Sequence, residues 1–237
     1  MQAVKSFFRS FSKGELLLWG ASVLLIVLSF CVFDRENWLT LLASLVGATS
    51  LIFCAKGNPA GQALMLLFSA LYGVISWTFS YYGEMITYLG MTAPMALAAL
   101  ISWLRHPFKG NRAEVRVNRL RAGEAAFALL LTAAVTAAFY FILKALDTAN
   151  LIPSTVSVAT SFLAVYLTFR RSPYYALAYA ANDVVLVVLW TLAAIEDITY
   201  LSVIICFVMF FANDLYGFIN WRRMEKRQKE SDAEPAA

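Results

Sequence analysis

Two pairs of neighbouring polar residues interrupt the apolar second half of the sequence, Asn182-Asp183 and Asn213-Asp214. Each pair lies in an apolar stretch of about 20 residues, which is long enough to cross a bilayer as a helix. A carboxylate at bilayer depth costs roughly 2.5–3.5 kcal/mol on insertion scales, so a partner, a proton or a ligand must offset that cost. We therefore expect the two helices to border a polar site inside a membrane protein.

Further polar and aromatic residues recur at helical spacing around these pairs. Residues three, four or eleven positions apart share one face of a helix, and lipid offers such a face no hydrogen-bond partner. These faces should therefore point toward the protein interior. The candidate substrate-binding residues on them are Tyr175, Tyr179, Asn182, Asp183 and Trp190 in the span 174–195, Asn213, Asp214 and Tyr216 in the last span, and Gln62, Tyr72 and Ser76 in the span 61–80.

The chemistry that these residues favour is the binding of a cation. No Lys or Arg lies deep in an apolar stretch, so Asp183 and Asp214 are either protonated or completed by a cation that comes and goes. Aromatic faces attract a desolvated cation by roughly 2 kcal/mol and also stack on flat rings. A planar, positively charged small molecule fits both features. The alternative is that neutral aspartates hold the helices together.

Composition places the chain in the membrane class. Of its 237 residues, 61% are hydrophobic and 14% charged, with a mean hydropathy of +0.68, whereas soluble domains are about 45–50% apolar and 25% charged. Cys31, Cys54 and Cys206 lack metal-ligand spacing, and His106 is the only histidine. We therefore expect neither an enzyme nor a bound cofactor or metal.

Apolar periodicity predicts an all-α membrane protein of eight spans. A basic amino-terminal tail should precede a retained first span, and the charged tail after Trp221 should fray into disorder. With both termini cytoplasmic, 17 of the 19 basic residues fall on the cytoplasmic side, all but Arg35 and Lys144. This pattern indicates the cell's inner membrane, and no nucleic-acid partner. The expected spans are 16–33, 38–55, 61–80, 85–104, 124–146, 152–169, 174–195 and 198–221.

A short motif occurs twice, which suggests an internal repeat. The pattern Trp-Thr followed by Glu-x-Ile-Thr-Tyr-Leu is present at 77–89 and again at 190–201. Its offset of four spans predicts two parallel three-helix repeats joined by a linker span, a known transporter plan with the site between the repeats. Chance similarity is the alternative. The motif adds Trp77 and Tyr88 to the candidate site.

Three further residues have open interpretations. Glu84 and Glu196 of the repeated motif either stabilise helix N-termini or act in gating. Pro94 should kink the fourth span and is a candidate hinge, although a static bend is the alternative. The predicted organisation is a tail and extra span at 1–35, a first repeat at 36–104, a basic loop and linker span at 105–150, a second repeat at 151–221 and a charged tail at 222–237.

The chain resembles the PnuC family of bacterial vitamin transporters. The resemblance rests on the helix arrangement, on the last-span pattern from Asn213 to Trp221 with Tyr216-Gly217, and on the segments 82–84 and 103–107. It implies a SWEET-like fold, a homotrimer, and facilitated diffusion followed by phosphorylation of the vitamin in the cytoplasm. The sequence departs from the family's Trp-x-x-Trp motif, where Tyr175 and Ala178 stand.

Residues and resemblance together predict a transporter for a cationic aromatic vitamin precursor, with nicotinamide riboside as the first choice. Alternating access around a site at the membrane midplane is the expected mechanism. Thiamine, another vitamin or a nucleoside is the alternative substrate. A proton-coupled carrier of another small solute, with Asp183 or Asp214 as the proton site, is the alternative mechanism.

Overall fold

The computed structural model describes residues 11–78, 82–148 and 150–233, and only the backbone of Tyr82. Lys5 and Arg9 of the expected basic tail lie outside these residues. Within them, eight helical segments are long and apolar enough to cross a membrane, which confirms the predicted number of spans. The helices are α2 (Lys13–Phe33), α3 (Trp38–Ala55), α4 (Pro59–Thr78), α5 (Tyr82–Ile86) continuing through the π-helix η1 (Thr87–Thr92) into α6 (Ala93–Arg105), α7 (Ala122–Ala145), α8 (Leu151–Phe169), α9 (Tyr175–Ala194), the 3-10 turn η2 (Ile198–Tyr200) and α10 (Leu201–Ala233).

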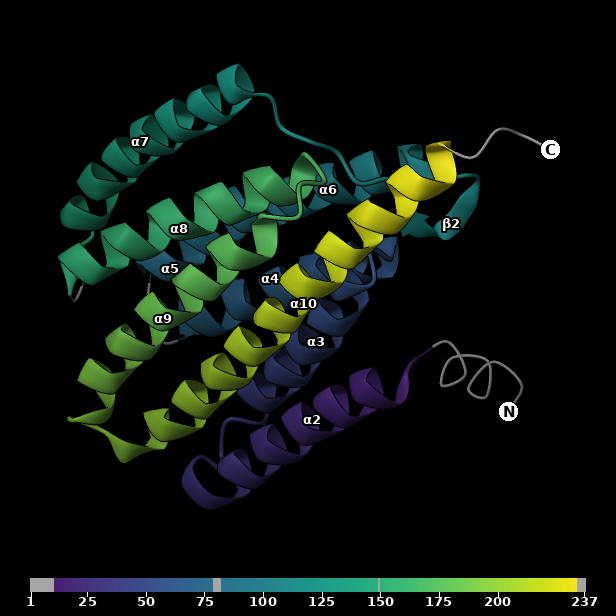
Figure 1. The fold of residues 1–237 in the computed structure, drawn as a ribbon. Coiled ribbons are helices and arrows are strands. Elements are labelled where there is room, and N and C mark those ends of the chain that lie inside the picture. The colour runs from purple at the N-terminus through teal and green to yellow at the C-terminus, as the bar shows by residue number, and fades with distance from the viewer. Residues whose placement is uncertain (1–10, 79–81, 149, 234–237) are drawn as a thin grey trace.

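We describe six of the helices as two consecutive groups of three (Figure 1). In the first group, α3 packs on α4 and α4 on α6; in the second, α8 packs on α9 and α9 on α10. The groups meet where α3 contacts α10 and where α6 contacts α8. Helix α2 covers α3 and α10, and α7 packs on α8. Many large apolar side chains remain exposed, as expected for helices that face lipid.

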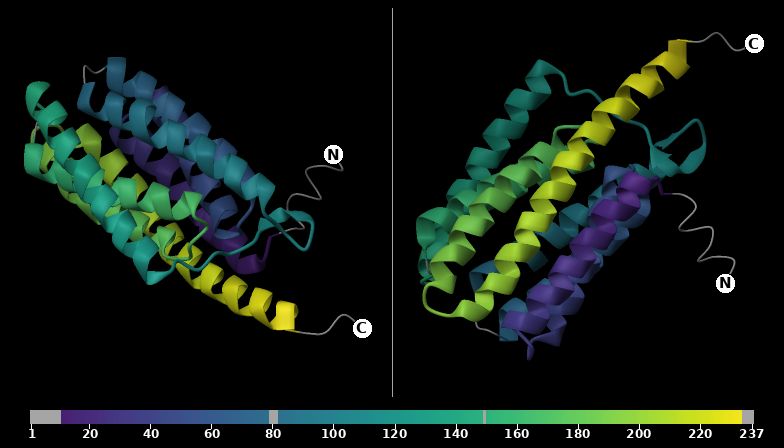
Figure 2. Two further views of the ribbon diagram at one scale, coloured as in Figure 1. Left: turned by 90° about the horizontal axis from the view of Figure 1, so that it is seen from above. Right: turned by 60° about the horizontal axis from the view of Figure 1, so that its bottom comes forward.

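The two ends of the bundle differ in structure (Figure 2). The start of α2, the α3–α4 and α8–α9 connections and the carboxyl end of α10 lie at one end, which we call the hairpin end. The α2–α3, α7–α8 and α9–α10 connections lie at the other, which we call the opposite end.

A β-hairpin corrects the all-α prediction for the loop between α6 and α7. Strand β1 (Pro107–Phe108) pairs antiparallel with β2 (Asn111–Val115). The turn between them uses positive φ angles, 46° at Lys109 and 81° at Gly110. Such short strands carry too few residues for a clear alternating pattern, so hydrophobic periodicity could not predict them.

The tail after Trp221 was expected to be a frayed helix end that passes into disorder, but the helix continues without a break as far as Ala233. Helix α10 continues that far because the loop docks on it. The Glu225 carboxylate is 6% exposed and pairs with Arg119 of the loop at 2.5 Å. The Gln228 side chain also hydrogen-bonds the loop backbone on both sides of Arg116. These contacts are between distant parts of the sequence, so helical periodicity could not reveal them.

A close approach of α3 and α4 depends on Gly61. A Cβ atom there would lie 2.6 Å from the backbone nitrogen of Cys54 and 2.9 Å from the carbonyl oxygen of Ser50. We expect Gly61→Ala to lower the free energy of unfolding by about 1–3 kcal/mol, because backbone cannot move away as a flexible side chain can. Thermal unfolding in detergent measures the effect. The matched control is Gly20→Ala, where a Cβ meets nothing within 4 Å and stability should not fall. Equal melting temperatures for the two variants would contradict the packing argument.

Candidate functional site

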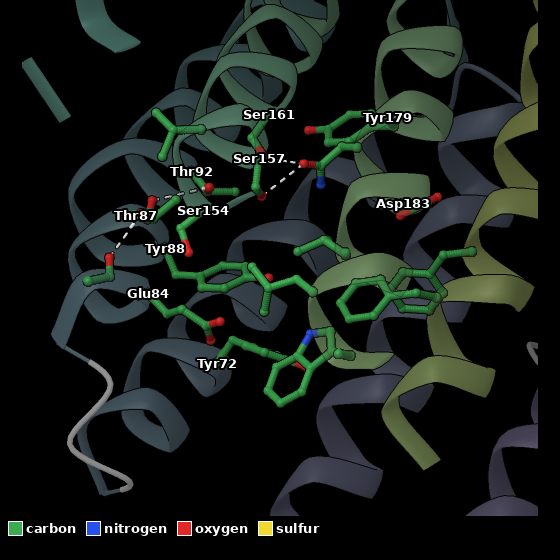
Figure 3. A pocket seen from close by; sticks show the side chains of 18 of the residues that line it. Tyr72, Glu84, Thr87, Tyr88, Thr92, Ser154, Ser157, Ser161, Tyr179 and Asp183 are labelled. Carbon is green, nitrogen blue, oxygen red and sulfur yellow. Dashed lines mark hydrogen bonds between the residues drawn. The ribbon is translucent and has the colours of Figure 1, made fainter. Parts of the chain in front are cut away.

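A cavity of about 390 Å³ lies between the two groups of helices. Its wall combines carboxyl groups, hydroxyl groups and aromatic rings, and it reaches the α7–α8 connection at the opposite end (Figure 3). Among the described residues that line it, none is Lys, Arg or His. Its polar and aromatic lining consists of Phe68, Tyr72, Glu84, Thr87, Tyr88, Thr92, Asp147, Thr148, Asn150, Ser154, Ser157, Ser161, Tyr179, Asn182, Asp183, Trp190, Phe207, Phe210 and Asp214.

Two carboxyl groups meet at the inner wall of the cavity. Asp183 of α9 and Asp214 of α10 are each 4% exposed, and both line the cavity. Two negative charges buried in one cavity repel each other, so a proton or a bound cation is needed to stabilise the pair. The Oδ2 atom of Asp183 has no hydrogen-bond partner. The pair can therefore accept a proton donor or a cation from the cavity.

The hydroxyl groups of α8 surround the side chain of Asn182. Its Oδ1 atom lies 3.1 Å from the Ser157 hydroxyl, 2.9 Å from that of Thr160 and 3.0 Å from that of Ser161. The serines also line the cavity, and Ser154 extends their row toward Glu84 (Figure 3). The sequence analysis missed this polar face of α8. Its signal was the recurrence of serine at 154, 157 and 161, which is the spacing of one helical face.

Aromatic rings form a second wall of the cavity. The rings of Tyr72 and Tyr88 lie 4.8 Å apart between centroids, and Phe68 lies 5.0 Å from Tyr72. Trp190, on α9, packs on Tyr200 at 5.2 Å. Rings at these distances offer both a stacking surface for a flat molecule and a negative face for a cation.

The segment that carries Tyr88 is helical but irregular. Residues Thr87–Thr92 form a π-helix, and Pro94 follows in the first turn of α6. The hydroxyl of Thr92 donates to the carbonyl oxygen of Thr87 at 3.2 Å, inside this segment. A π-helical insertion changes which side chains face inward and is common at functional sites.

The two copies of the repeated motif have different structures. Glu84 lies in the first turn of α5 and lines the cavity, whereas Glu196 is exposed in the α9–α10 connection. Beside Glu196, Asp197 caps η2 by accepting from the backbone N–H of Thr199 at 2.9 Å, which lowers the pKa of Asp197 below its usual range. Only the first copy therefore contributes its glutamate to the cavity.

The structure brings seven of the thirteen candidate residues together and places six elsewhere. The seven in the cavity are Tyr72, Tyr88, Tyr179, Asn182, Asp183, Trp190 and Asp214. The other six lie outside it. Gln62 donates to the Cys54 Sγ atom, Asn213 to Ser22 and Tyr216 to Glu15. Ser76 is buried, Trp77 is 64% exposed, and Tyr175 packs on Trp221.

Helical geometry explains why Asn213 and Asp214 separate. Neighbouring residues of a helix point about 100° apart, and here that angle directs Asp214 toward the cavity and Asn213 away from it. Asn213 and Tyr216 instead face α2, where Asn213 lies 2.8 Å from the Ser22 hydroxyl and Tyr216 lies 3.0 Å from the Glu15 carboxylate. These two residues thus hold the extra amino-terminal helix on the bundle.

A polar and aromatic cavity within a bundle of membrane-length helices is the arrangement of a membrane transport protein for a small molecule. A family model described as nicotinamide mononucleotide transporter matches residues 37–223. The chain therefore belongs to this family, that of the PnuC transporters, and is a membrane transporter and not an enzyme.

Individual relatives agree with this assignment. The chain is 29% identical over 201 residues to a nicotinamide riboside transporter PnuC from Neisseria mucosa, which covers 83% of this chain and 76% of the relative. It is 20% identical over 216 residues to a nicotinamide riboside transporter PnuC from Haemophilus influenzae, covering 89% and 91% of the two chains. A crystal structure of the vitamin B3 transporter PnuC superimposes with a TM-score of 0.80 at 25% identity, covering 92% of this chain and 94% of that one.

Proposed function

We propose that the protein carries nicotinamide riboside, a cationic and aromatic vitamin precursor, and binds it beside Asp183 and Asp214. The observation that carries the proposal is a pair of buried carboxyl groups in a cavity whose described lining has no basic side chain. The relatives from Neisseria mucosa and Haemophilus influenzae are named for transport of this compound. Thiamine, which is also cationic and aromatic, is the alternative substrate that the same carboxyl pair favours.

The cavity suits the separate parts of such a molecule. Its volume of about 390 Å³ falls in the range of about 300–1,000 Å³ found for small-molecule sites. The pyridinium ring is proposed to lie between the Tyr72–Tyr88 pair and Trp190, with its charge toward Asp183. The sugar hydroxyls would then meet Asn182 and the serines of α8.

Alternating access between two parallel repeats is the proposed mechanism. The repeats are α3, α4 and α5–α6, and α8, α9 and α10, with α7 as the linker and α2 as an extra helix. The repeated sequence motif and the consecutive packing within each group support this assignment. The π-helix Thr87–Thr92 with Pro94 is the proposed hinge, because it joins two helical pieces of the first repeat beside the cavity.

The positive-inside rule supports an orientation with the hairpin end in the cytoplasm. Both termini are then cytoplasmic, the membrane is the inner membrane of the cell, and the cavity reaches the outer side. A homotrimer, which the resemblance to PnuC transporters implies, completes the proposal. Fusion of a reporter to the carboxyl end tests the orientation, and light scattering of the purified protein tests the assembly.

Uptake into proteoliposomes tests the proposed substrate. Radiolabelled nicotinamide riboside should enter vesicles that contain the protein, and excess unlabelled compound should compete. Protein-free vesicles are the control. Uptake of thiamine without uptake of nicotinamide riboside would assign the alternative substrate.

Proton coupling is the second candidate mechanism, favoured by the burial of two carboxyl groups, those of Asp183 and Asp214, in one cavity. A pair that shares one proton can exchange that proton for a cation. Under facilitated diffusion, an imposed pH gradient should leave the final accumulation of nicotinamide riboside unchanged. Accumulation above the outside concentration, abolished by a protonophore, would establish the coupled mechanism instead.

A further inference from the structure

Two buried tryptophans join the two groups of helices at the hairpin end in the same way. The indole N–H of Trp103, on α6, donates to the carbonyl oxygen of Thr168 at 2.9 Å, at the carboxyl end of α8. The indole N–H of Trp221, on α10, donates to the carbonyl oxygen of Cys54 at 2.8 Å, at the carboxyl end of α3. Both indoles are 0% exposed. In each case the third helix of one group binds the first helix of the other.

The residue before each tryptophan also forms a hydrogen bond between the same two helices. The hydroxyl of Ser102 donates to the carbonyl oxygen of Phe169 at 3.0 Å, and the amide of Asn220 donates to that of Ala55 at 2.9 Å. Phe169 and Ala55 directly follow Thr168 and Cys54, so the acceptors are consecutive carbonyl groups at the carboxyl end of each helix. The carbonyl groups of Thr168 and Cys54 also accept from the backbone N–H groups of Arg171 and Gly57. Four hydrogen bonds therefore join the groups in two equivalent pairs.

The two helix ends that accept these bonds also have the same shape. Each is followed by a residue with positive φ, 66° at Gly57 and 57° at Arg171, and then by a proline two residues later. Pro59 begins α4, and Pro173 lies two residues before the start of α9. The loop between α6 and α7 binds both of these turns. The backbone N–H of Val115 donates to the Gly57 carbonyl at 2.9 Å, and that of Asn118 donates to the Arg171 carbonyl at 3.0 Å.

These contacts lie between the cavity and the hairpin end. The rings of Trp103 and Trp221 are 5.3 Å apart, and Tyr175 packs on Trp221 at 5.0 Å. One helical turn further along α9 is Tyr179, which lines the cavity. At its other side, the cavity reaches the α7–α8 connection. The packed indoles therefore close one end of the path on which a transported molecule would leave.

We infer that Trp103 and Trp221, together with Ser102 and Asn220, form the gate at the hairpin end of the transport path through their four cross-group hydrogen bonds. We call this arrangement the indole clamp. The inference rests on the proposed alternating access, because a carrier must open the end that this structure shows closed. Opening the clamp separates α6 from α8 and α10 from α3, so the two tryptophans should contribute equally.

A native cysteine reports on the clamp directly. Cys54 is 2% exposed and carries the carbonyl group that Trp221 binds. In a Cys31→Ala/Cys206→Ala background, the rate at which N-ethylmaleimide alkylates Cys54 measures opening of the hairpin end. Trp103→Phe and Trp221→Phe each keep an aromatic ring but remove the N–H donor. Each should raise the Cys54 alkylation rate about fivefold, as expected for loss of one hydrogen bond, and the double variant should raise it further.

Two controls separate gating from general loss of structure. Trp38→Phe changes a tryptophan that is 67% exposed at the start of α3 and should leave the rate unchanged. In a Cys31→Ala/Cys54→Ala background, alkylation of the buried Cys206 should not respond to the clamp variants, because Cys206 packs in the core on the other side of the cavity.

The outcomes distinguish this inference from the proposed substrate. If Trp103→Phe and Trp221→Phe show the same Cys54 alkylation rate as Trp38→Phe, the indole clamp is not the gate, even if wild-type vesicles take up nicotinamide riboside. Equal increases at Cys54 and Cys206 would also overturn it, because the variants would then loosen the whole fold. A selective increase at Cys54 in a protein that takes up no nicotinamide riboside would support the clamp and refute the substrate.

Discussion

Replacing both Asp183 and Asp214 by asparagine should weaken the binding of nicotinamide riboside about a hundredfold, which corresponds to about 2.8 kcal/mol. Asparagine keeps the size and hydrogen-bonding capacity of the side chain but removes its charge. Both carboxyl groups are almost fully buried in a cavity that no described basic residue lines, so a bound cation loses the opposite charges beside which it is proposed to lie. Asp183→Asn alone should cost about tenfold, because Asp214 can still ionise.

A titration of the purified variants by calorimetry measures this effect. The matched control is Asp34→Asn, since Asp34 is also buried, at 7% exposure, but lies at the end of α2 and accepts a hydrogen bond from Asn37. Its affinity should equal that of the wild type. An unchanged dissociation constant in the double variant would show that the carboxyl pair does not bind the cation and has a structural role.

Asn182→Leu should reduce uptake of nicotinamide riboside about ten- to hundredfold, the range expected when a buried hydrogen-bonding group loses its partner. Leucine has the same number and branching of side-chain heavy atoms as asparagine but cannot accept hydrogen bonds from the three α8 hydroxyl groups that now meet at Oδ1. Without this acceptor, the α8 hydroxyl groups on the polar wall of the cavity would no longer be held in a fixed orientation toward the hydroxyl groups of the substrate. Uptake by proteoliposomes, normalised to the amount of inserted protein, measures the loss.

A variant of α8 tests the same wall from its other side. Ser157→Ala/Ser161→Ala removes two of the three hydroxyl groups and should cause a smaller loss than Asn182→Leu. Thr155→Val is the matched control, because the Thr155 hydroxyl donates to the Leu151 carbonyl within its own helix and does not line the cavity. If Thr155→Val reduced uptake as much as the serine variant, the effect would belong to the helix and not to the site.

Hydropathy and charge were sufficient to predict the eight helices to within about three residues, apart from the end of α10. Spans are long, apolar and interrupted by polar turns, so each one carries its own signal. The continuation of α10 to Ala233 depends on Glu225 and Gln228, whose partners lie in a loop more than 100 residues earlier. Contacts of this kind have no local pattern.

The candidate site could be predicted where a polar residue in an apolar helix must face the protein interior. It was harder to predict which of two adjacent polar residues faces the cavity. Asp183 and Asp214 stood out because charge in an apolar helix needs a reason. Helical spacing alone could not decide that Asp214 faces the cavity while Asn213 faces α2, because that depends on a helix elsewhere in the chain. The π-helix Thr87–Thr92 shifts the register of its side chains, so Glu84 could not be assigned to the cavity from the sequence.

Thermal unfolding of the purified protein with a panel of ligands tests the central claim most directly, because a ligand that binds the folded state raises the melting temperature. The panel contains nicotinamide riboside and thiamine, which are cationic, and riboflavin and uridine, which are not. The cavity described here predicts that nicotinamide riboside raises the melting temperature in a dose-dependent way, and that the Asp183→Asn/Asp214→Asn variant loses this response. A response to riboflavin or uridine, with none to either cation, would contradict the claim that buried carboxyl groups select a positively charged ring.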